Sequence, residues 1–370
     1  MVTFLPSRPG SLADVPSFDR AIGGAESNVA CVLAAAGHSA RWVSRLGADG
    51  FGDHLIETVG TFGVDVASVR RDAARPTGVY FRTAGDRASD AHEVAYYRTG
   101  SAASAMTAGN VDLAAVRAGR VLHLSGITAA LSDGCLGLVR ELVARRPGSP
   151  LVSFDVNFRA GLWQRVDGPR VLWELARQAD LVFVGVDEAE EAWGIKGGPA
   201  AIREALPEPQ VLVVKQGVQG ATVFASAGVS RAHGAAGGPQ LERGRERGRV
   251  GVGGTPSVRG CATDPSPAPT PATFVPAPHV DVVAAVGAGD AFAAGFISAT
   301  LRGLPLRDRL RHGHLIAAAA LTVPGDLAVP PARDHLDRLA ALDDAAWERL
   351  HLGPGWTRTA DRVEKEVRTS

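Results

Sequence analysis

Four short apolar segments, which begin at residues 121, 151, 181 and 211, constrain the fold more than any other feature of the sequence. Each is nearly continuous in apolar residues, and a helical stretch is expected after each. Such runs are typical of strands that are buried on both faces of a parallel sheet. The sequence therefore predicts an α/β fold with a mostly parallel central sheet, built from Val121-Leu-His-Leu-Ser, Leu151-Val-Ser-Phe-Asp, Leu181-Val-Phe-Val-Gly and Val211-Leu-Val-Val-Lys.

Polar residues follow these segments at the points where the strands are expected to end. In open parallel sheets, ligands bind at the carboxyl ends of the strands, which lie along one edge of the sheet. We therefore expect these residues to surround a ligand site. They are Ser125-Gly126, Asp155-Val-Asn157-Phe-Arg159, Asp187-Glu188-Ala-Glu190 and Lys215-Gln-Gly217-Val-Gln-Gly220.

A glycine-rich turn, Gly287-Ala288-Gly289, precedes an acid and a strongly helical segment. The glycines let the backbone approach a ligand closely, and the first N–H groups of the helix have no partners within it. Such a turn favours an anion, because the free amides and the positive end of the helix dipole point the same way. Asp290 then has two interpretations. It caps the helix, or it takes a proton from a hydroxyl that attacks a bound phosphate.

Residues 77–98 differ in character from the α/β pattern around them. Alternating residues flank a polar turn at residues 85–90, which predicts a β-hairpin. A hairpin has no obvious place in a parallel sheet, so we expect a separate flap. Tyr96 and Arg98 would lie on one face of its second strand, because they are two residues apart.

The first segment with helical periodicity runs from Gly24 to Ala36 and is ended by Gly37. Glu26 and Asn28 lie in its first turn. Polar side chains at this position usually cap the helix or face solvent, so the spacing alone assigns them no further role.

The composition is that of an ordinary globular chain. Its 370 residues, 45% hydrophobic and 21% charged, suit one large α/β domain or two smaller ones. Lys plus Arg equals Asp plus Glu at 39 each, so no overall charge attracts nucleic acid or an anionic membrane. The start shows no signal-peptide pattern, and the longest apolar run, around residues 315–323, is too short to span a bilayer. The three widely spaced cysteines suit a reducing cytoplasm.

Residues 228–279 interrupt the regular pattern. Arginines alternate with Gly and Glu in the first half, and seven prolines fall between Pro256 and Pro278. Such a composition does not bury a core, so we predict a disordered, low-complexity surface insertion. We also predict a frayed tail over residues 353–370, which leaves residues 1–350 as a single domain.

With these segments in hand, the sequence resembles the ribokinase-like, phosphofructokinase-B type carbohydrate kinases from about residue 5 to residue 342, apart from the insertion. The resemblance implies a three-layer α/β/α sandwich with a small β-sheet lid, whose strands we place at about residues 14–23 and 77–98. An exposed lid face also predicts a homo-oligomer formed through the lid. The motifs that carry the resemblance are Gly23-Gly24-Ala-Glu-Ser-Asn28-Val-Ala, Gly47-Ala-Asp-Gly-Phe-Gly52 and Val286-Gly-Ala-Gly-Asp290-Ala-Phe-Ala-Ala-Gly295.

Within that family, the chain looks most like the 2-keto-3-deoxygluconate kinases. This implies Mg²⁺ and ATP, a small sugar acid as partner molecule, and transfer to the 6-hydroxyl of 2-dehydro-3-deoxy-D-gluconate in catabolism of the Entner–Doudoroff type. A fructokinase-type or ribokinase-type activity and a catalytically silent sugar-binding relative are the alternatives. The subfamily motifs are Tyr96-Tyr97-Arg98-x-Gly100-Ser101-Ala102, His123-Leu-Ser-Gly-Ile-Thr128 and Asp155-Val-Asn157-Phe-Arg159-x-x-Leu162-Trp163.

The resemblance also implies roles for single residues. Asp290 matches the catalytic base, and the anion hole for the transferred phosphate is matched by Gly287, Ala288 and Gly289. Contacts to the sugar acid are matched by Gly24, Asn28, Tyr96, Arg98, Arg159 and Asp326. The nucleotide and metal sites are matched by Asn157, Lys215, Gly217, Gly220 and, for Mg²⁺, Glu188. A sugar acid needs a cation for its carboxylate, and an arginine at 98 or 159 offers a planar fork that binds it with two hydrogen bonds.

The sequence departs from the family pattern in three places. Members normally open with a core β-strand that carries a Gly-Glu-type motif, and here Met1 begins at what resembles the following strand. Either the start lies upstream or the sheet lacks one edge of its substrate cleft. The metal motif Asn-x-x-Glu reads Gly185-Val-Asp-Glu188, a loss that is tolerable because phosphates and water hold most of an Mg²⁺ ion. The insertion enters near part of the nucleotide-pocket wall, where it bears on the adenine contacts.

Overall fold

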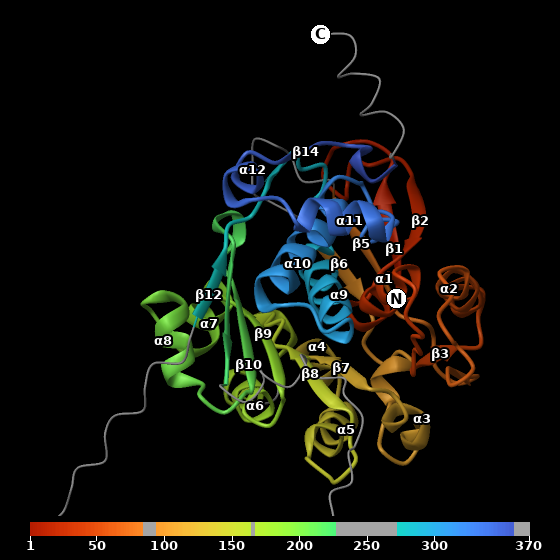
Figure 1. Ribbon diagram of the computed structural model, residues 1–370. Helices are drawn as coiled ribbons and strands as arrows, with labels where there is room; N and C mark the ends of the chain where they lie inside the picture. The colour runs from red at the N-terminus through yellow and green to blue at the C-terminus, as the bar shows by residue number, and fades with distance from the viewer. Residues whose placement is uncertain (84–93, 164–166, 227–271, 359–370) are drawn as a thin grey trace, which may run out of the picture.

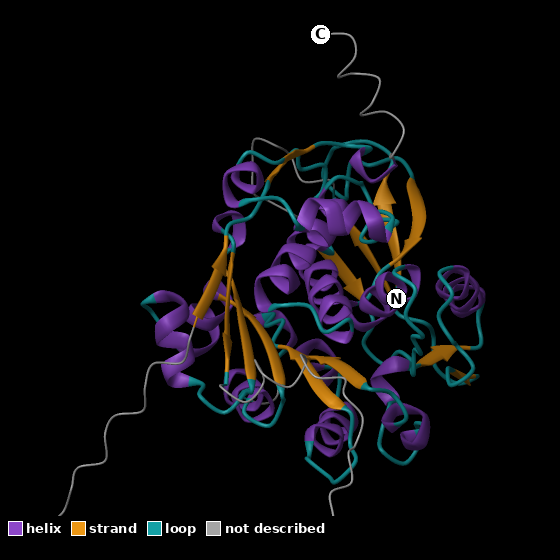
Figure 2. Ribbon diagram, in the orientation of Figure 1, coloured by secondary structure: helices purple, strands orange, loops and turns teal. Residues whose placement is uncertain are grey.

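The computed structural model of the chain describes residues 1–83, 94–163, 167–226 and 272–358. Helices cover both faces of a six-stranded sheet, and a smaller four-stranded sheet lies apart from it (Figure 1, Figure 2). The predicted α/β/α sandwich with a separate small sheet is therefore confirmed.

The main sheet has the strand order β12-β11-β10-β9-β8-β7. Its four parallel strands begin at the predicted residues and are β7 (Val121–Ser125), β8 (Leu151–Asp155), β9 (Leu181–Gly185) and β10 (Val211–Lys215). The expectation of a helix after the fourth segment was wrong. A short turn leads instead into β11 (Ala221–Ala225), which is antiparallel to β10 and pairs with β12 (Ala272–Val275).

Alternate side chains of the strands enter two separate cores. On β9, Val182 and Val184 belong to the first core, whereas Leu181 and Phe183 belong to the second. The first core is covered by α4 (Gly126–Ala130), α5 (Asp133–Val143), α6 (Gly168–Ala176), α7 (Val186–Trp193) and α8 (Gly198–Ala205). The second is covered by α1 (Ala25–Ala35), α9 (Ala288–Leu301), α10 (Leu306–Leu321), α11 (Arg333–Ala340) and α12 (Asp344–Glu348).

No helix in the described part of the chain has the length and apolar character to cross a bilayer.

The small sheet has the order β2-β1-β5-β6, and we call it the lid sheet. β1 (Val2–Pro6) pairs in antiparallel with β2 (Phe18–Ile22) and in parallel with β5 (Val79–Arg82), which pairs with β6 (Val94–Tyr97). The lid sheet therefore includes the first residues of the chain, which the predicted lid ranges left out. Beside it lie α2 (Gly50–Thr61) and the short parallel pair β3 (Arg45–Gly47) and β4 (Arg70–Asp72). α3 (Leu113–Arg117) packs instead against the first core.

The predicted disordered insertion is wrong at its carboxyl end, because residues 272–275 and 279–280 are in strands. β12 completes one edge of the main sheet, where Val275 is buried in the second core and Phe274 faces solvent. β13 (His279–Val280) then pairs in parallel with β14 (His351–Leu352). The alternation of buried and exposed side chains along β12 is typical of an edge strand that has one covered face.

The predicted frayed tail is also wrong over its first residues. Trp356 opens a single turn, η4 (Trp356–Arg358), and packs against the second core. The rest of both predictions, for residues 228–271 and 359–370, lies outside the described residues.

Helices α9 and α10 pack closely because Gly295 faces α10 without a side chain. A Cβ atom on Gly295 would lie 2.5 Å from the carbonyl oxygen of His312. Gly295→Ala should therefore lower the free energy of unfolding by about 1–3 kcal/mol, measured by urea denaturation. Gly137, on the exposed face of α5, is the control, because a Cβ there meets nothing within 4 Å. Gly137→Ala should stabilise by up to about 1 kcal/mol, and equal effects of the two changes would contradict this account.

Candidate active site

The Gly287-Ala288-Gly289 turn enters α9 in a conformation that only glycine adopts easily. Gly287 has φ of +77° and occupies the N-cap position of α9, without a side-chain cap. A Cβ on Gly287 would clash with the backbone carbonyl of Asp326. The first N–H groups of α9 therefore remain available for a ligand, and the turn can hold an anion.

Asp290 is the third residue of α9, so it does not occupy the N-cap position. Its Oδ2 accepts a hydrogen bond of 2.9 Å from Nδ2 of Asn28 on α1. Burial raises the pKa of Asp290 to about 8; the nearby Asp155 and Glu26 carboxylates add to this, while Asn28 and Lys215 oppose it. A carboxyl group that titrates near neutral pH can accept and release a proton during a reaction.

Lys215, at the end of β10, provides a cation beside the turn. Its Nζ donates a 3.1 Å hydrogen bond to Oδ1 of Asp155, which ends β8. A Cβ on Gly289 would lie 3.7 Å from Nζ, so the ammonium group lies close to the backbone of the turn. Burial alone would lower the pKa of Lys215, but Asp155 and Glu188 outweigh it and the pKa is raised. Lys215 therefore keeps its positive charge.

The loop after β8 brings two more predicted residues to this edge of the sheet. Asn157 is buried and has φ of +41°, the only positive φ of a non-glycine residue in the described chain, and its Oδ1 has no partner there. Strained, unpaired polar residues of this kind are concentrated at functional sites. Arg159 is largely exposed, and its Nη1 lies 3.8 Å from Oε1 of Glu188.

Glu188 is in the first turn of α7, where its Oε2 accepts a 2.7 Å hydrogen bond from the Gly185 N–H. Its other oxygen faces Arg159. The described residues contain no cluster of three or more His, Cys, Asp or Glu side chains that could hold a metal ion. The residues fit an ion that takes most of its ligands from phosphate and water, with Glu188 as an outer carboxylate.

Gly217 and Gly220 lie in the turn between β10 and β11, at the same edge of the sheet as Lys215. Both have positive φ, of +57° and +136°. Val218 between them is 95% exposed, so this turn projects into solvent. The turn is open to a bulky ligand.

Arg98 is a buried cation on the side of the site formed by the lid sheet. Its guanidinium lies over the ring of Tyr96, with Cζ 4.7 Å from the ring centroid, and Nη2 is buried without a partner among the described residues. Burial lowers the pKa of Arg98, and the Glu26 carboxylate partly opposes this. An unpaired buried guanidinium is energetically unfavourable unless an anion binds it. Gly24 is the N-cap of α1, and a Cβ on it would lie 3.6 Å from the amino nitrogen of Met1.

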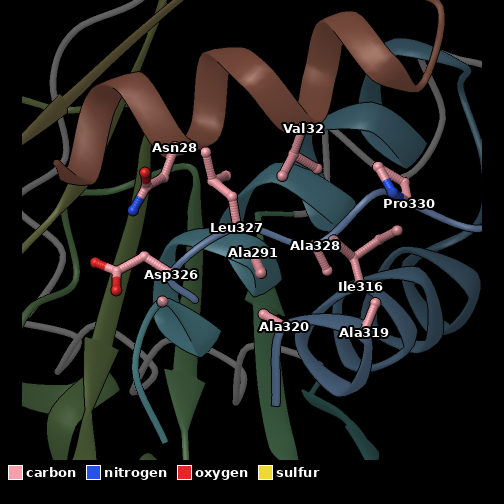
Figure 3. Close-up of a pocket in the computed structure, with 11 residues that line it drawn as sticks. Asn28, Val32, Ala291, Ile316, Ala319, Ala320, Asp326, Leu327, Ala328 and Pro330 are labelled. Carbon is pink, nitrogen blue, oxygen red and sulfur yellow. The ribbon is translucent and has the colours of Figure 1, made fainter. Parts of the chain in front are cut away.

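Asp326 is held by the lid sheet. Tyr80 on β5 donates to its Oδ2, and Nη2 of Arg82 lies 3.3 Å from its Oδ1. Figure 3 shows Asp326 and Asn28 at one end of a small cavity of about 10 Å³, with apolar side chains at the other end. In this structure the Asp326 carboxylate is therefore engaged within the protein, and its predicted contact with a substrate stays a prediction.

The sequence matches the pfkB family of carbohydrate kinases over residues 2–237 and 270–333. The chain belongs to this family. It is a sugar kinase, a phosphotransferase with an alcohol group as acceptor. The match resumes at residue 270, which agrees with the position of β12.

Relatives of this kinase cover nearly all of its length. It is 30% identical to the 2-dehydro-3-deoxygluconokinase of Bacillus subtilis (strain 168) over 340 residues, which are 91% of each chain. The crystal structure of a PfkB protein from Polaromonas sp. JS666 superposes with a TM-score of 0.70 at 29% identity and covers 91% of this chain and 96% of that one. A sugar kinase from Pyrococcus horikoshii, solved in complex with ATP, shares the fold with a TM-score of 0.70 at 22% identity over 94% of this chain and 97% of its own.

Two acidic residues at the kinase site were assigned no role of their own from the sequence. Asp155 fixes Lys215, and its place at the end of a buried strand was the available signal. Glu26 accepts hydrogen bonds from Ser125 Oγ at 2.7 Å and Thr128 Oγ1 at 2.6 Å, and so joins α1 to the end of β7. Its sequence position suggested only a helix cap, because its partners are about one hundred residues away.

The raised pKa of Asp290 predicts a pH-dependent stability of this kinase. The folded protein holds a proton on Asp290 up to about pH 8, whereas the unfolded chain releases it near its ordinary pKa of 3.8. The contribution of Asp290 to stability therefore falls as pH rises between these values. The side chain of the Asp290→Asn variant does not titrate. The free energy of unfolding of this variant, relative to that of the wild type, should therefore increase as pH rises, as measured by urea unfolding at about pH 5 and about pH 8. Asp133→Asn, in the exposed first turn of α5, should show no such change; parallel profiles for all three proteins would exclude the raised pKa.

Proposed function

We propose that this pfkB kinase transfers the terminal phosphoryl group of ATP to the 6-hydroxyl of 2-dehydro-3-deoxy-D-gluconate. The observation that carries the choice of a sugar acid is the buried Arg98 guanidinium with an unpartnered Nη2. A carboxylate would supply the missing partner through charge-assisted hydrogen bonds. The similarity to the 2-dehydro-3-deoxygluconokinase of Bacillus subtilis (strain 168), over 91% of each chain, supports this substrate.

The donor would bind along the carboxyl ends of β8 and β10. Free amides of the Gly287–Gly289 turn and the ammonium of Lys215 suit the phosphates, while Asn157, Gly217 and Gly220 line the adjoining edge of the sheet. Mg²⁺ bound with the nucleotide would neutralise developing negative charge on the phosphates. On the protein side, Glu188 is the carboxylate that would bind that ion.

Asp290 would act as the catalytic base for the acceptor hydroxyl. Asn28 holds its carboxylate at the entrance of α9, beside the amides that face the phosphate. Proton removal by Asp290 makes the hydroxyl oxygen a better nucleophile, and the amides and Lys215 stabilise negative charge at the phosphoryl group. Gly24, Tyr96, Arg98, Arg159 and Asp326 remain the proposed surroundings of the sugar acid.

The lid sheet is the proposed contact between two copies of the kinase. Its outer strand β6 exposes Val94, Tyr96 and Tyr97, the last at 65%. Exposed aromatic residues on an edge strand favour coverage by a second protein surface.

We also propose that the kinase acts in the cytoplasm. Cys31 and Cys135 are both buried and unpaired, and they would stay reduced there.

Substrate choice can be tested with a coupled assay of ATP consumption. We expect turnover with 2-dehydro-3-deoxy-D-gluconate and much less with fructose or ribose, which lack the carboxylate. Arg98→Met should raise KM for the sugar acid about 10- to 100-fold, because a charge-assisted hydrogen bond is lost, with little effect on a neutral sugar. Arg159→Met, at the largely exposed second arginine, is the matched comparison. Higher activity of the wild type with fructose or ribose would contradict the sugar-acid proposal. Activity with the galactonate epimer of the sugar acid, measured in the same assay, tests which stereochemistry the kinase accepts.

The role of Asp290 can be tested separately from binding. Asp290→Asn should reduce kcat about 100- to 10,000-fold, because the proton acceptor is lost, while ATP still binds in calorimetry. Near-full activity of this variant would refute the assignment of the base. Absence of turnover in the folded wild type with all four sugars would instead favour a silent sugar-binding relative.

A further inference from the structure

The first turn of α1 carries two polar side chains that bind different parts of the kinase. Asn28 donates a 2.9 Å hydrogen bond to Oδ2 of Asp290 on α9. Glu26, two residues earlier, binds the end of β7 instead. α1 packs against both β7 and α9, so it lies between the strand end and the acid. The position of its first turn therefore determines whether Asn28 reaches Asp290.

Three donors converge on one oxygen of Glu26. Its Oε1 accepts from Ser125 Oγ at 2.7 Å, from Thr128 Oγ1 at 2.6 Å and from the Ser125 N–H at 3.2 Å. Ser125 occupies the N-cap position of α4, where a serine hydroxyl ordinarily accepts a hydrogen bond from the helix, but it makes no such bond here. The hydroxyls of Ser125 and Thr128 are thus committed to Glu26.

The start of α1 has no cap of its own. Its N-cap is Gly24, which has φ of +147° and makes no side-chain capping bond, and Gly23 precedes it after β2. Ser27 donates to the Gly24 carbonyl within the same turn. Among the described residues, the hydrogen bonds of Glu26 and Asn28 are therefore those that tie side chains of this turn to other elements.

Glu26 and Asn28 act on the pKa of Asp290 in opposite directions. Burial is the largest influence and raises this pKa to about 8. The hydrogen bond from Asn28 opposes the rise, whereas the charge of Glu26 adds to it. The other groups that act on Asp290 are Asp155, which raises the pKa, and Lys215, which lowers it. Loss of the contact with Asn28 and loss of the charge at Glu26 should therefore shift the pKa in opposite directions.

We propose that Glu26 is a positioning residue for phosphoryl transfer. It anchors the first turn of α1 to the end of β7 and to α4, and so keeps Asn28 in contact with Asp290. Because β7 is paired with β8, the anchor also fixes the acid relative to the neighbouring strand ends. The inference rests on the proposed role of Asp290 as the base, and it applies to whichever sugar the kinase accepts.

The test measures kcat/KM against pH, because its fall at low pH reports the proton affinity of the base in the free enzyme. The wild-type midpoint is expected at about pH 8. Ser125→Ala combined with Thr128→Val removes both hydroxyl donors and leaves the charge of Glu26 in place. This double variant should raise the midpoint by about one pH unit and lower kcat/KM at about pH 7 roughly tenfold, because a hydrogen bond to the base is lost. The lost activity should return at high pH.

Two further variants separate positioning from other effects. Glu26→Gln keeps an amide oxygen that can accept from both hydroxyls, but it removes the charge, so the midpoint should move to lower pH. Thr300→Val is the matched control, because it removes a hydroxyl that donates a 2.8 Å hydrogen bond at the far end of α9. The control should leave the midpoint unchanged.

An unchanged midpoint in the double variant, with an equal loss of kcat/KM at every pH, would overturn the proposal, because Glu26 would then support only the fold. A downward shift in Glu26→Gln with none in the double variant would also overturn it, because charge alone would explain the effect. Urea unfolding checks that each variant folds. If the double variant does not, Thr128→Val alone should give a smaller upward shift, and no shift there would refute positioning.

Asp290→Asn distinguishes this inference from the proposed function. Near-full activity of that variant would refute the base, and the positioning role would fail with it. Loss of activity in Asp290→Asn together with an unmoved midpoint in the double variant would refute the role of Glu26 alone.

Discussion

Burial of the parallel strands on both faces determines where this kinase can place its polar groups. The interiors of β8, β9 and β10 are apolar, and charged groups are found only where the strands end. The ion pair between Asp155 and Lys215 lies at this boundary and links the ends of β8 and β10 across β9. Removing one partner would leave a buried, uncompensated charge, so the two residues depend on each other.

The same ion pair influences the acid on α9. Asp290 is near the Asp155 carboxylate, which raises its pKa, and near the Lys215 ammonium, which lowers it. Asn28 stabilises the carboxylate through a hydrogen bond, yet burial prevails. The proton affinity of Asp290 is therefore set by groups on three elements, the ends of β8 and β10 and the first turn of α1. A carboxyl group whose pKa is set in this way depends on correct packing of both cores.

Local patterns predicted the elements, whereas contacts between distant segments were not predictable. The four parallel strands begin where the apolar runs begin, because burial on both faces requires such runs. The turn at Gly287 was also predictable, because its backbone conformation and its contact with Asp326 require glycine. The contacts of Glu26 with Ser125 and of Tyr80 with Asp326 join residues 99 and 246 positions apart, and no periodicity reports such pairs. β12 was missed because the proline-rich composition extends across its start.

Asp326 connects the lid sheet to the Gly287-Ala288-Gly289 turn. Its carboxylate is held by Tyr80 and Arg82 on β5, and Arg82 also donates a 2.6 Å hydrogen bond to the Pro324 carbonyl. Its own backbone carbonyl packs so closely on Gly287 that no side chain fits there. The side chain of Asp326 thus binds the lid sheet, while its backbone packs against the turn at the start of α9. A shift of β5 would therefore reach the free amides at the start of α9, because Asp326 contacts both the lid sheet and Gly287.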